Sequence, residues 1–174
     1  GDTLSWKHLT GDLLYYLAPR RGEGLKDGEA VLVETILGEE FRSAPEDSAS
    51  VIPLALMRRE LLSKAPVGGR LPDITLHGTL RHRGKSREAA FRLRRLRGNP
   101  VRVVLFTKGC GSCREVISEA DSLVAANRRA KALLVDVDDL PDGESVAALR
   151  SFDLSSLPYI TEASRKGIIT RRYL

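Results

Sequence analysis

The two cysteines of this chain, Cys110 and Cys113, are separated by two residues in the segment Gly109-Cys110-Gly111-Ser112-Cys113-Arg114. They follow an apolar run over residues 101–106, which is typical of a buried strand, and they precede a predicted helix. A cysteine on such a strand-to-helix turn lies at the helix N-terminus, where free backbone N–H groups and the helix dipole favour a thiolate. The spacing therefore predicts a redox pair in which Cys110 is the nucleophile.

Three other interpretations of the pair are weaker. A closed zinc site needs four ligands, and beside the two cysteines the chain offers only His8, His77 and His82. A purely structural disulfide would close a loop too short to constrain the unfolded chain much. Two unreactive thiols packed in the core would have to be covered by neighbouring side chains, and Gly111 and Ser112 are too small to cover them. Redox chemistry remains the favoured interpretation.

The length and composition suit one ordinary domain, or a domain of about 100 residues with an extension. We expect no integral membrane segment in this chain, because no apolar stretch approaches the ~18 to 20 residues of a membrane span. The chain starts at Gly1 and its one methionine is Met57, so we expect that a targeting segment or an expression tag has been removed. A single cysteine pair suits an oxidising or a reducing compartment, and composition alone leaves the location open.

The net charge of +5 is concentrated in one segment, where eight basic side chains face a single acid, Glu88. These residues are Arg81, Arg83, Lys85, Arg87, Arg92, Arg94, Arg95 and Arg97. Such a run could meet nucleic acid phosphates. The segment has only one aromatic residue, Phe91, and no recognisable binding motif, and its pattern indicates apolar anchors between solvated charges. We therefore expect no nucleic acid partner.

The pattern of apolar residues changes character near residue 66. Before it, the sequence predicts helices over 4–17, 29–41 and 50–64, a loop over 20–27 and a polar connector over 43–50. The segment Ala65-Pro-Val-Gly-Gly then breaks the chain. We expect two domains, a helical N-terminal extension over 1–66 and a second domain over 67–174.

In the second domain, strands and helices alternate. Strands are predicted over 71–76, 101–106 and 132–137, helices over 112–127 and 145–152, and a hairpin of strands over 159–162 and 168–172. The strand over 101–106 is almost continuously apolar, which suits a central parallel strand that is covered on both faces.

This order of elements, with C-x-x-C at the end of a central strand and Leu157-Pro158 entering the next-to-last strand, resembles the thioredoxin fold. The segments Gly69-Arg-Leu-Pro-Asp-Ile-Thr-Leu76 and Leu96-Arg-Gly-Asn-Pro-Val-Arg-Val-Val-Leu-Phe106 resemble the opening of TlpA/ResA-like thiol-disulfide oxidoreductases of the redoxin superfamily. The resemblance covers about residues 68–174. It implies an α/β fold of the thioredoxin-like class, a central mixed sheet flanked by helices, preceded here by a small helical segment.

The resemblance also implies roles for individual residues. Cys110 is the attacking cysteine, Cys113 the resolving cysteine, and Pro158 a cis-proline that faces the disulfide; the alternative for Pro158 is a strand-edge proline. A cis-proline would leave the backbone of Leu157 free to pair with an extended substrate. The residues expected to contact substrate are Gly109, Gly111, Ser112, Leu157 and Pro158. The expected partners are protein thiols or disulfides and a redox partner, and no cofactor or metal is needed.

The chain departs from the family pattern at several positions. Gly109 and Ser112 stand where family members usually carry an aromatic residue and a proline, and Val104 stands where thioredoxin has a buried aspartate. Family members place an acid at the position of Val116, whereas Glu115 lies one position earlier. Glu115 is thus a candidate for proton transfer, with a solvated helix charge as the alternative. The terminal helix typical of the fold is not expected.

A helical extension joined to such a domain, with an end of the form Lys166-Gly-Ile-Ile-Thr-Arg-Arg-Tyr173, resembles thioredoxin-like proteins of the bacterial envelope. That resemblance implies a periplasmic or otherwise extracytoplasmic location. The sequence predicts a thiol-disulfide oxidoreductase. Two alternatives stay open: a peroxiredoxin, because Thr107-Lys-Gly-Cys110 matches the motif T-x-x-C although its usual proline is Val103, and a non-catalytic binding module that has kept the fold.

Overall fold

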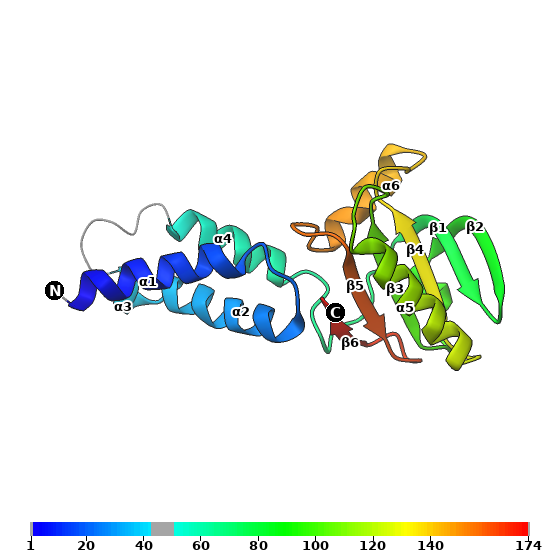
Figure 1. Cartoon of the computed structure of the whole chain (residues 1–174), viewed down its shortest axis with the longest axis horizontal. Helices are drawn as coiled ribbons and strands as arrows, with labels where there is room; N and C mark the ends of the chain where they lie inside the picture. The colour runs from blue at the N-terminus through cyan, green and yellow to red at the C-terminus, as the bar shows by residue number, and fades with distance from the viewer. Residues whose placement is uncertain (1, 43–50, 174) are drawn as a thin grey trace. The chain divides into compact units, whose positions relative to one another are not determined.

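The computed structural model describes residues 2–42 and 51–173, and the chain divides into two compact units, 1–64 and 65–174 (Figure 1). The described residues of the first unit form the helices α1 (Asp2–Leu17), α2 (Glu23–Leu37), α3 (Glu39–Arg42) and α4 (Val51–Leu62). The helices expected over 4–17 and 50–64 are confirmed as α1 and α4.

Two expectations for the first unit were wrong. The loop predicted over 20–27 ends at Gly22, because α2 begins at Glu23 and continues through Gly24 and Gly28. The helix predicted over 29–41 is the second half of α2, which stops at Gly38 before the short α3. Each helical glycine costs ~1 kcal/mol relative to alanine, and burial of one face of α2 offsets that cost. The connector expected over 43–50 lies outside the described residues.

A charged group lies inside this helical unit. Glu29 is fully buried and accepts hydrogen bonds from Lys26 Nζ at 2.7 Å and from Arg58 Nε. Lys26 Nζ also donates to the carbonyl oxygen of Ala18 at 2.9 Å. Buried charges are tolerated where they are paired in this way. The network links α2 to α4 and to the turn after α1.

The second unit contains one six-stranded mixed sheet in the order β2-β1-β4-β3-β5-β6. Its elements are β1 (Thr75–His82), β2 (Lys85–Arg92), a 3-10 turn (Leu93–Leu96), β3 (Val101–Phe106), α5 (Cys113–Ala126), β4 (Lys131–Asp136), α6 (Gly143–Ala148), a second 3-10 turn (Leu149–Ser151), β5 (Tyr159–Ala163) and β6 (Ile169–Arg172). Strands β3 and β4 are parallel, and the other neighbouring strands are antiparallel. The predicted fold class, a mixed sheet flanked by helices and preceded by a helical segment, is confirmed.

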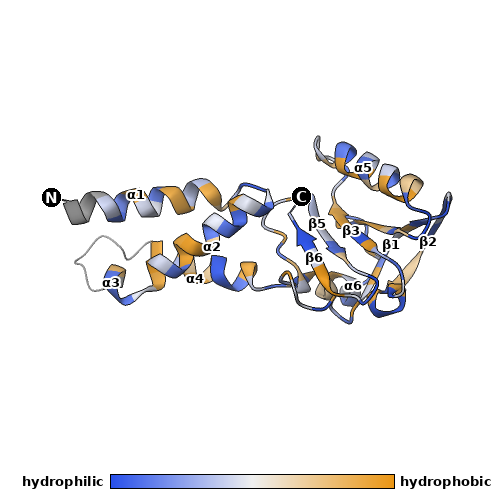
Figure 2. Ribbon diagram, turned by 90° about the horizontal axis from the view of Figure 1, so that it is seen from below, coloured by the Kyte–Doolittle hydropathy of each residue, from blue (hydrophilic) through white to orange (hydrophobic). Residues whose placement is uncertain are grey.

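Strand β3 lies inside the sheet because its side chains are apolar on both faces. Val103 and Leu105 face a core that also contains Phe152 and Tyr159, whereas Val104 faces the core beneath α5. Alternate side chains of a strand point to opposite faces, so a strand covered on both sides has few polar positions. Figure 2 shows α5 and α6 on opposite sides of this sheet. The bounds of β3 agree with the sequence prediction.

The first strand was predicted in the wrong place, and one strand was missed. Of the run over 71–76, only the residues from Thr75 onward belong to a strand. Pro72 has no N–H to donate to a neighbouring strand. The N–H of Leu71 instead donates to the carbonyl oxygen of Gly167 at 2.9 Å. Strand β2 lies in the basic run and has no apolar alternation, because it is an edge strand that buries only Phe91. The run's apolar anchors Phe91, Leu93 and Leu96 are buried as expected.

Gly78 allows β1 to approach β4. A Cβ atom at this position would collide with the backbone carbonyl oxygen of Leu134 and would lie 3.1 Å from Cγ2 of Val135. Backbone atoms in the middle of a sheet cannot move aside cheaply, so the position requires a residue without a side chain. This close approach connects the β1–β2 hairpin to the central strands.

We predict that Gly78→Ala lowers the free energy of unfolding by about 2 to 4 kcal/mol, because it separates β1 from β4. The matched control is Gly143→Ala at the start of α6, where an added Cβ meets nothing within 4 Å. The control should leave stability unchanged or raise it by less than about 1 kcal/mol. Chemical denaturation followed by circular dichroism measures both, and equal stability of the two variants would contradict the prediction.

Candidate functional site: the Cys110–Cys113 disulfide

The two cysteines form a disulfide at the carboxyl end of β3, with their Cα atoms 5.3 Å apart. Cys113 is the first residue of α5 and is 2% exposed, whereas Cys110 lies three residues earlier in a turn and is half-buried. The backbone N–H of Cys110 bonds the carbonyl oxygen of Thr107, and that of Cys113 bonds the carbonyl oxygen of Cys110, both at 3.2 Å. Cys110 is therefore the more exposed of the two cysteines.

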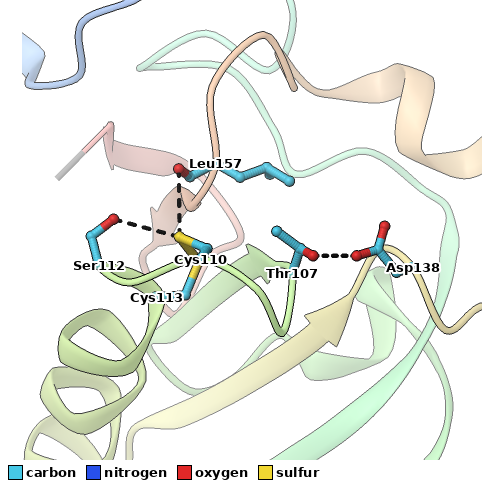
Figure 3. Close-up of a disulfide and its surroundings, with 6 residues drawn as sticks. All are labelled: Thr107, Cys110, Ser112, Cys113, Asp138 and Leu157. Carbon is cyan, nitrogen blue, oxygen red and sulfur yellow. Dashed lines mark hydrogen bonds between the residues drawn. A yellow bond between two sulfur atoms is a disulfide. The ribbon is translucent and has the colours of Figure 1, made fainter.

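Two oxygen atoms approach Cys110 Sγ from different elements (Figure 3). The hydroxyl oxygen of Ser112 is 3.5 Å away, and the carbonyl oxygen of Leu157 is 3.9 Å away. A disulfide sulfur carries no proton, so Ser112 is the donor in the oxidised protein, and Leu157 can accept only from a reduced thiol. The same hydroxyl can donate to a thiolate at Cys110 after reduction.

The loop before β5 carries the other predicted substrate-contacting residues. The Leu157–Pro158 peptide bond is cis, as the family resemblance implied. Pro158 is buried and Leu157 is half-buried. The structure thus brings the carbonyl oxygen of Leu157 to Cys110 Sγ, although the two residues are 47 residues apart in sequence.

The glycines on either side of Cys110 leave this site open. Gly109 and Gly111 are exposed, and an added Cβ at either position would meet nothing within 4 Å. No side chain from these positions covers the disulfide. A protein segment can therefore reach Cys110 without displacing either residue.

Two of the departures noted in the sequence can be placed in the structure. Val104 is fully buried in the core beneath α5, so this strand supplies no carboxylate under the disulfide. Glu115 is exposed in the first turn of α5. Within the described residues its carboxylate makes no hydrogen bond or ion pair with either cysteine.

A polar link beside the disulfide was not predicted from the sequence. The hydroxyl of Thr107 donates to a carboxylate oxygen of Asp138 (Figure 3), and Lys108 Nζ lies 3.3 Å from carboxylate oxygens of both Asp136 and Asp139. The acids, Asp136 first, raise the pKa of Lys108. The link ties the turn before Cys110 to the loop after β4. The sequence held a signal for this link, because the residues that follow two parallel neighbouring strands, here β3 and β4, meet at the same edge of the sheet.

A second unpredicted link holds the loop that carries Leu157. Asp153 is buried and accepts hydrogen bonds from Ser155 N at 3.0 Å and from the hydroxyl of Tyr173 at 2.7 Å. Burial raises the pKa of Tyr173, and the hydrogen bond to Asp153 adds to the shift, so this phenol stays a donor. The ring of Tyr173 packs edge-on against Tyr159, with centroids 5.2 Å apart. The end of the described chain is thereby tied to the loop that carries Leu157.

Within residues 2–42 and 51–173, no group of three or more His, Cys, Asp or Glu side chains is arranged to hold a metal ion. Over the same ranges, no helix has both the length and the apolar character needed to cross a membrane.

Comparisons with known proteins bear on the fold. No protein-family model matches the chain, and no curated protein sequence matches it. A thioredoxin-like protein from Bacteroides caccae superposes with a TM-score of 0.60 at 13% identity, over 86% of this chain and 58% of that one. The second unit has a thioredoxin-like fold. The chain spans less than two thirds of the length of that protein.

Two further solved structures match at lower TM-scores. One is assigned as the thiol:disulfide interchange protein DsbE of Chlorobium tepidum, with a TM-score of 0.46 and 16% identity over 65% of this chain and 86% of that one. The other is the thioredoxin domain of a thiol-disulfide oxidoreductase from Bacteroides vulgatus, with a TM-score of 0.40 and 18% identity over 65% of this chain and 89% of that one.

We predict that Ser112→Ala raises the pKa of the Cys110 thiol in the reduced protein, because the thiolate loses a hydrogen-bond donor. The measurement is thiolate absorbance, or the alkylation rate, as a function of pH. The matched control is Ser118→Ala, which removes an exposed hydroxyl from α5 and should leave the titration unchanged. An unchanged titration in the Ser112 variant would show that its hydroxyl does not stabilise the thiolate.

Proposed function

We propose that this protein is a thiol-disulfide oxidoreductase that exchanges disulfides with partner proteins through Cys110 and Cys113. The observation that carries the proposal is the unequal exposure of the two cysteines. Cys110 is half-buried and lies beside the Ser112 hydroxyl and the Leu157 carbonyl, while Cys113 is 2% exposed at the start of α5. One sulfur can meet a partner, and the other can react only with its neighbour.

The reaction follows from this arrangement. In the reduced protein, the Cys110 thiolate attacks one sulfur of a partner disulfide, and the second partner sulfur leaves as a thiolate. The Cys113 thiolate then attacks Cys110 Sγ, the mixed disulfide breaks, and the first partner sulfur leaves as a thiolate. Two electrons pass to the partner and the Cys110–Cys113 disulfide forms. Oxidation of a partner dithiol is the same sequence in reverse.

The surroundings of Cys110 have separate roles in this scheme. The Ser112 hydroxyl stabilises the thiolate as nucleophile and as leaving group. The exposed Gly109 and Gly111 let a partner segment approach, and the backbone beside the cis Leu157–Pro158 bond offers an edge for an extended segment. Glu115, exposed in the first turn of α5, is our candidate for exchanging protons with solvent.

We place the protein with the TlpA/ResA-like type and in the bacterial cell envelope, in the periplasm or another extracytoplasmic space. Support for the type comes from the motifs Gly69-to-Leu76 and Leu96-to-Phe106, and support for the location comes from the resemblance of the helical extension and of the end Lys166-to-Tyr173 to thioredoxin-like proteins of the bacterial envelope. Its partners are protein thiols or disulfides and a second protein that resets the cysteine pair. The electrons move between sulfur atoms, so the scheme requires no cofactor.

The peroxiredoxin alternative loses support from the structure. Its T-x-x-C motif would need the Thr107 hydroxyl at the reacting sulfur, but this hydroxyl donates to Asp138. Thr107 instead contacts Cys110 through the backbone, where the N–H of Cys110 donates to the carbonyl oxygen of Thr107. A binding module without catalysis keeps the same fold, and the next experiment separates it from an exchanger.

We predict that Cys113→Ser accumulates a mixed disulfide with a protein substrate, because the resolving thiolate is gone. Cys110→Ser should form none and should reduce insulin no faster than the uncatalysed reaction. The two variants are matched controls, since each replaces one sulfur by oxygen. Non-reducing electrophoresis and mass spectrometry of the trapped adduct report the result.

Mixed disulfides formed equally by both variants would overturn the assignment of roles to the two cysteines. Insulin reduction at the uncatalysed rate by the wild-type protein, with no adduct in either variant, would leave the binding module as the function. Rapid peroxide consumption by the reduced protein, with slow disulfide exchange, would instead establish the peroxidase alternative.

A further inference from the structure

A basic cleft lies in the second unit, away from the disulfide. It has a volume of about 320 Å³ and is lined by Arg70, Leu71, Asp73, Arg94, Arg97, Lys166 and Gly167. These residues come from three separate segments of the chain: the stretch before β1, the 3-10 turn with the residue after it, and the β5–β6 turn. Four of the seven residues are cationic, and one is acidic.

The three segments are held together by backbone hydrogen bonds. Leu71 N donates to the carbonyl oxygen of Gly167, and Gly98 N donates to that of Arg165, both at 2.9 Å. Gly167 has a φ of +78°, and a Cβ there would lie 2.8 Å from Cδ of Arg97, so the turn packs directly against the stem of that arginine. The cations therefore converge on a built concave surface.

The one acid in the cleft does not neutralise it. Both carboxylate oxygens of Asp73 accept hydrogen bonds from Arg92, at 2.9 Å each, and Arg94 Nη1 is 3.9 Å from the nearer oxygen. The hydrogen bond from Arg92 lowers the pKa of Asp73, and the charges of Arg92, Arg94 and Arg97 add to the shift. The acid is thus already paired, and the positive field of the cleft remains.

The remaining cations have capacity to bind. Over the described residues, the side chains of Arg70 and Lys166 make no hydrogen bond or ion pair, and Arg97 uses only Nε, which donates to the carbonyl oxygen of Arg94 at 3.1 Å. Like charges around one cavity repel each other, and an anion that enters the cavity relieves this repulsion and lowers the free energy. Solvated surface charges would not need to converge on one concave site.

We propose that this cleft binds a multiply charged phosphoryl group, either of a free phosphate ester or diphosphate or of a phospholipid headgroup. Guanidinium groups match phosphate oxygens two at a time, and three arginines line the cleft. Several cations favour an anion of more than one charge. Leu71 is the one large apolar side chain of the lining, so the bound part is compact and polar. The volume suits a small ligand.

The cleft is distinct from the redox site. Its arginines precede the first residue of β3, and the β5–β6 turn lies beside that same end because Val101 pairs with Ala163. Cys110 follows the other end of β3. A strand of six residues separates the two sites by roughly 17 Å at about 3.3 Å per residue. The proposal does not depend on the redox function.

The test is calorimetric titration of the full chain with inorganic pyrophosphate at low ionic strength. The double variant Arg70→Gln/Lys166→Gln and the single variant Arg94→Gln should each weaken binding about tenfold or more. Arg70 and Lys166 have no side-chain bonds to lose within the described residues, so their replacement should leave the fold intact. The matched control for the double variant is Arg83→Gln/Lys85→Gln, in the β1–β2 turn and at the first residue of β2, which removes the same charge outside the cleft and should change the affinity less than about twofold.

A second arm identifies the source of the phosphoryl group. Vesicles of phosphatidylcholine with and without phosphatidic acid, whose phosphomonoester headgroup can carry two negative charges, are sedimented with the wild-type chain and with each variant. Binding of pyrophosphate that requires Arg70 and Lys166 supports a free phosphate ligand, and vesicle binding alone with the same requirement supports a lipid headgroup. The proposal is overturned if neither probe binds, or if the control variant weakens binding as much as the cleft variants do.

Discussion

The structure of the second unit depends on the burial of β3 on both of its faces. Val103 and Leu105 pack into one core, Val104 packs into the other beneath α5, and the strand is paired on both edges with β4 and β5. Such a strand cannot shift register, because a slip by one residue would turn every side chain to the opposite face of the sheet. The position at which β3 ends is therefore fixed, and the turn that carries Cys110 starts from a rigid point.

From that point, three neighbouring segments shape the disulfide. The turn before Cys110 is held by Thr107 and Lys108 on the aspartates after β4, α5 begins at Cys113, and the loop with Leu157 is anchored through Asp153 to Tyr173. The result is one accessible and one covered sulfur. Disulfide exchange by two successive attacks needs this asymmetry, because the covered sulfur must react with its neighbour and not with the partner. The link from packing to proposed function is thus a difference in burial between two chemically identical groups.

Much of the fold could be predicted from the sequence where local pattern and tertiary environment agree. The strand over 101–106 was predicted with its correct bounds, because a continuous apolar run of strand length directly before C-x-x-C is typical of a buried central strand. Strand β2 could not be predicted in the same way, since an edge strand with one buried side chain has the composition of a solvated loop. The start of α2 was missed because Gly24 and Gly28 are loop signals that burial of Val33 and Ile36 overrides.

The sequence predicted the reacting residues of the candidate site but not the residues that hold them in place. Cys110, Cys113 and the Leu157-Pro158 pair follow from spacing and from the family resemblance. Asp138 and Tyr173 act on the site through contacts that span 31 and 20 residues, and no local pattern marks them. The same holds for the basic cleft, whose cations belong to segments that only the folded chain brings together.

The reduction potential of the Cys110–Cys113 pair decides whether these two sulfurs exchange disulfides with other proteins. The protein is equilibrated with glutathione or dithiothreitol buffers, the free thiols are trapped, and each species is weighed by mass spectrometry. We predict a reversible two-electron couple between about −120 and −270 mV, the range of proteins that exchange disulfides with others. A pair that is not reduced reversibly, or whose potential lies below about −300 mV, would be a structural disulfide and would contradict the proposed exchange.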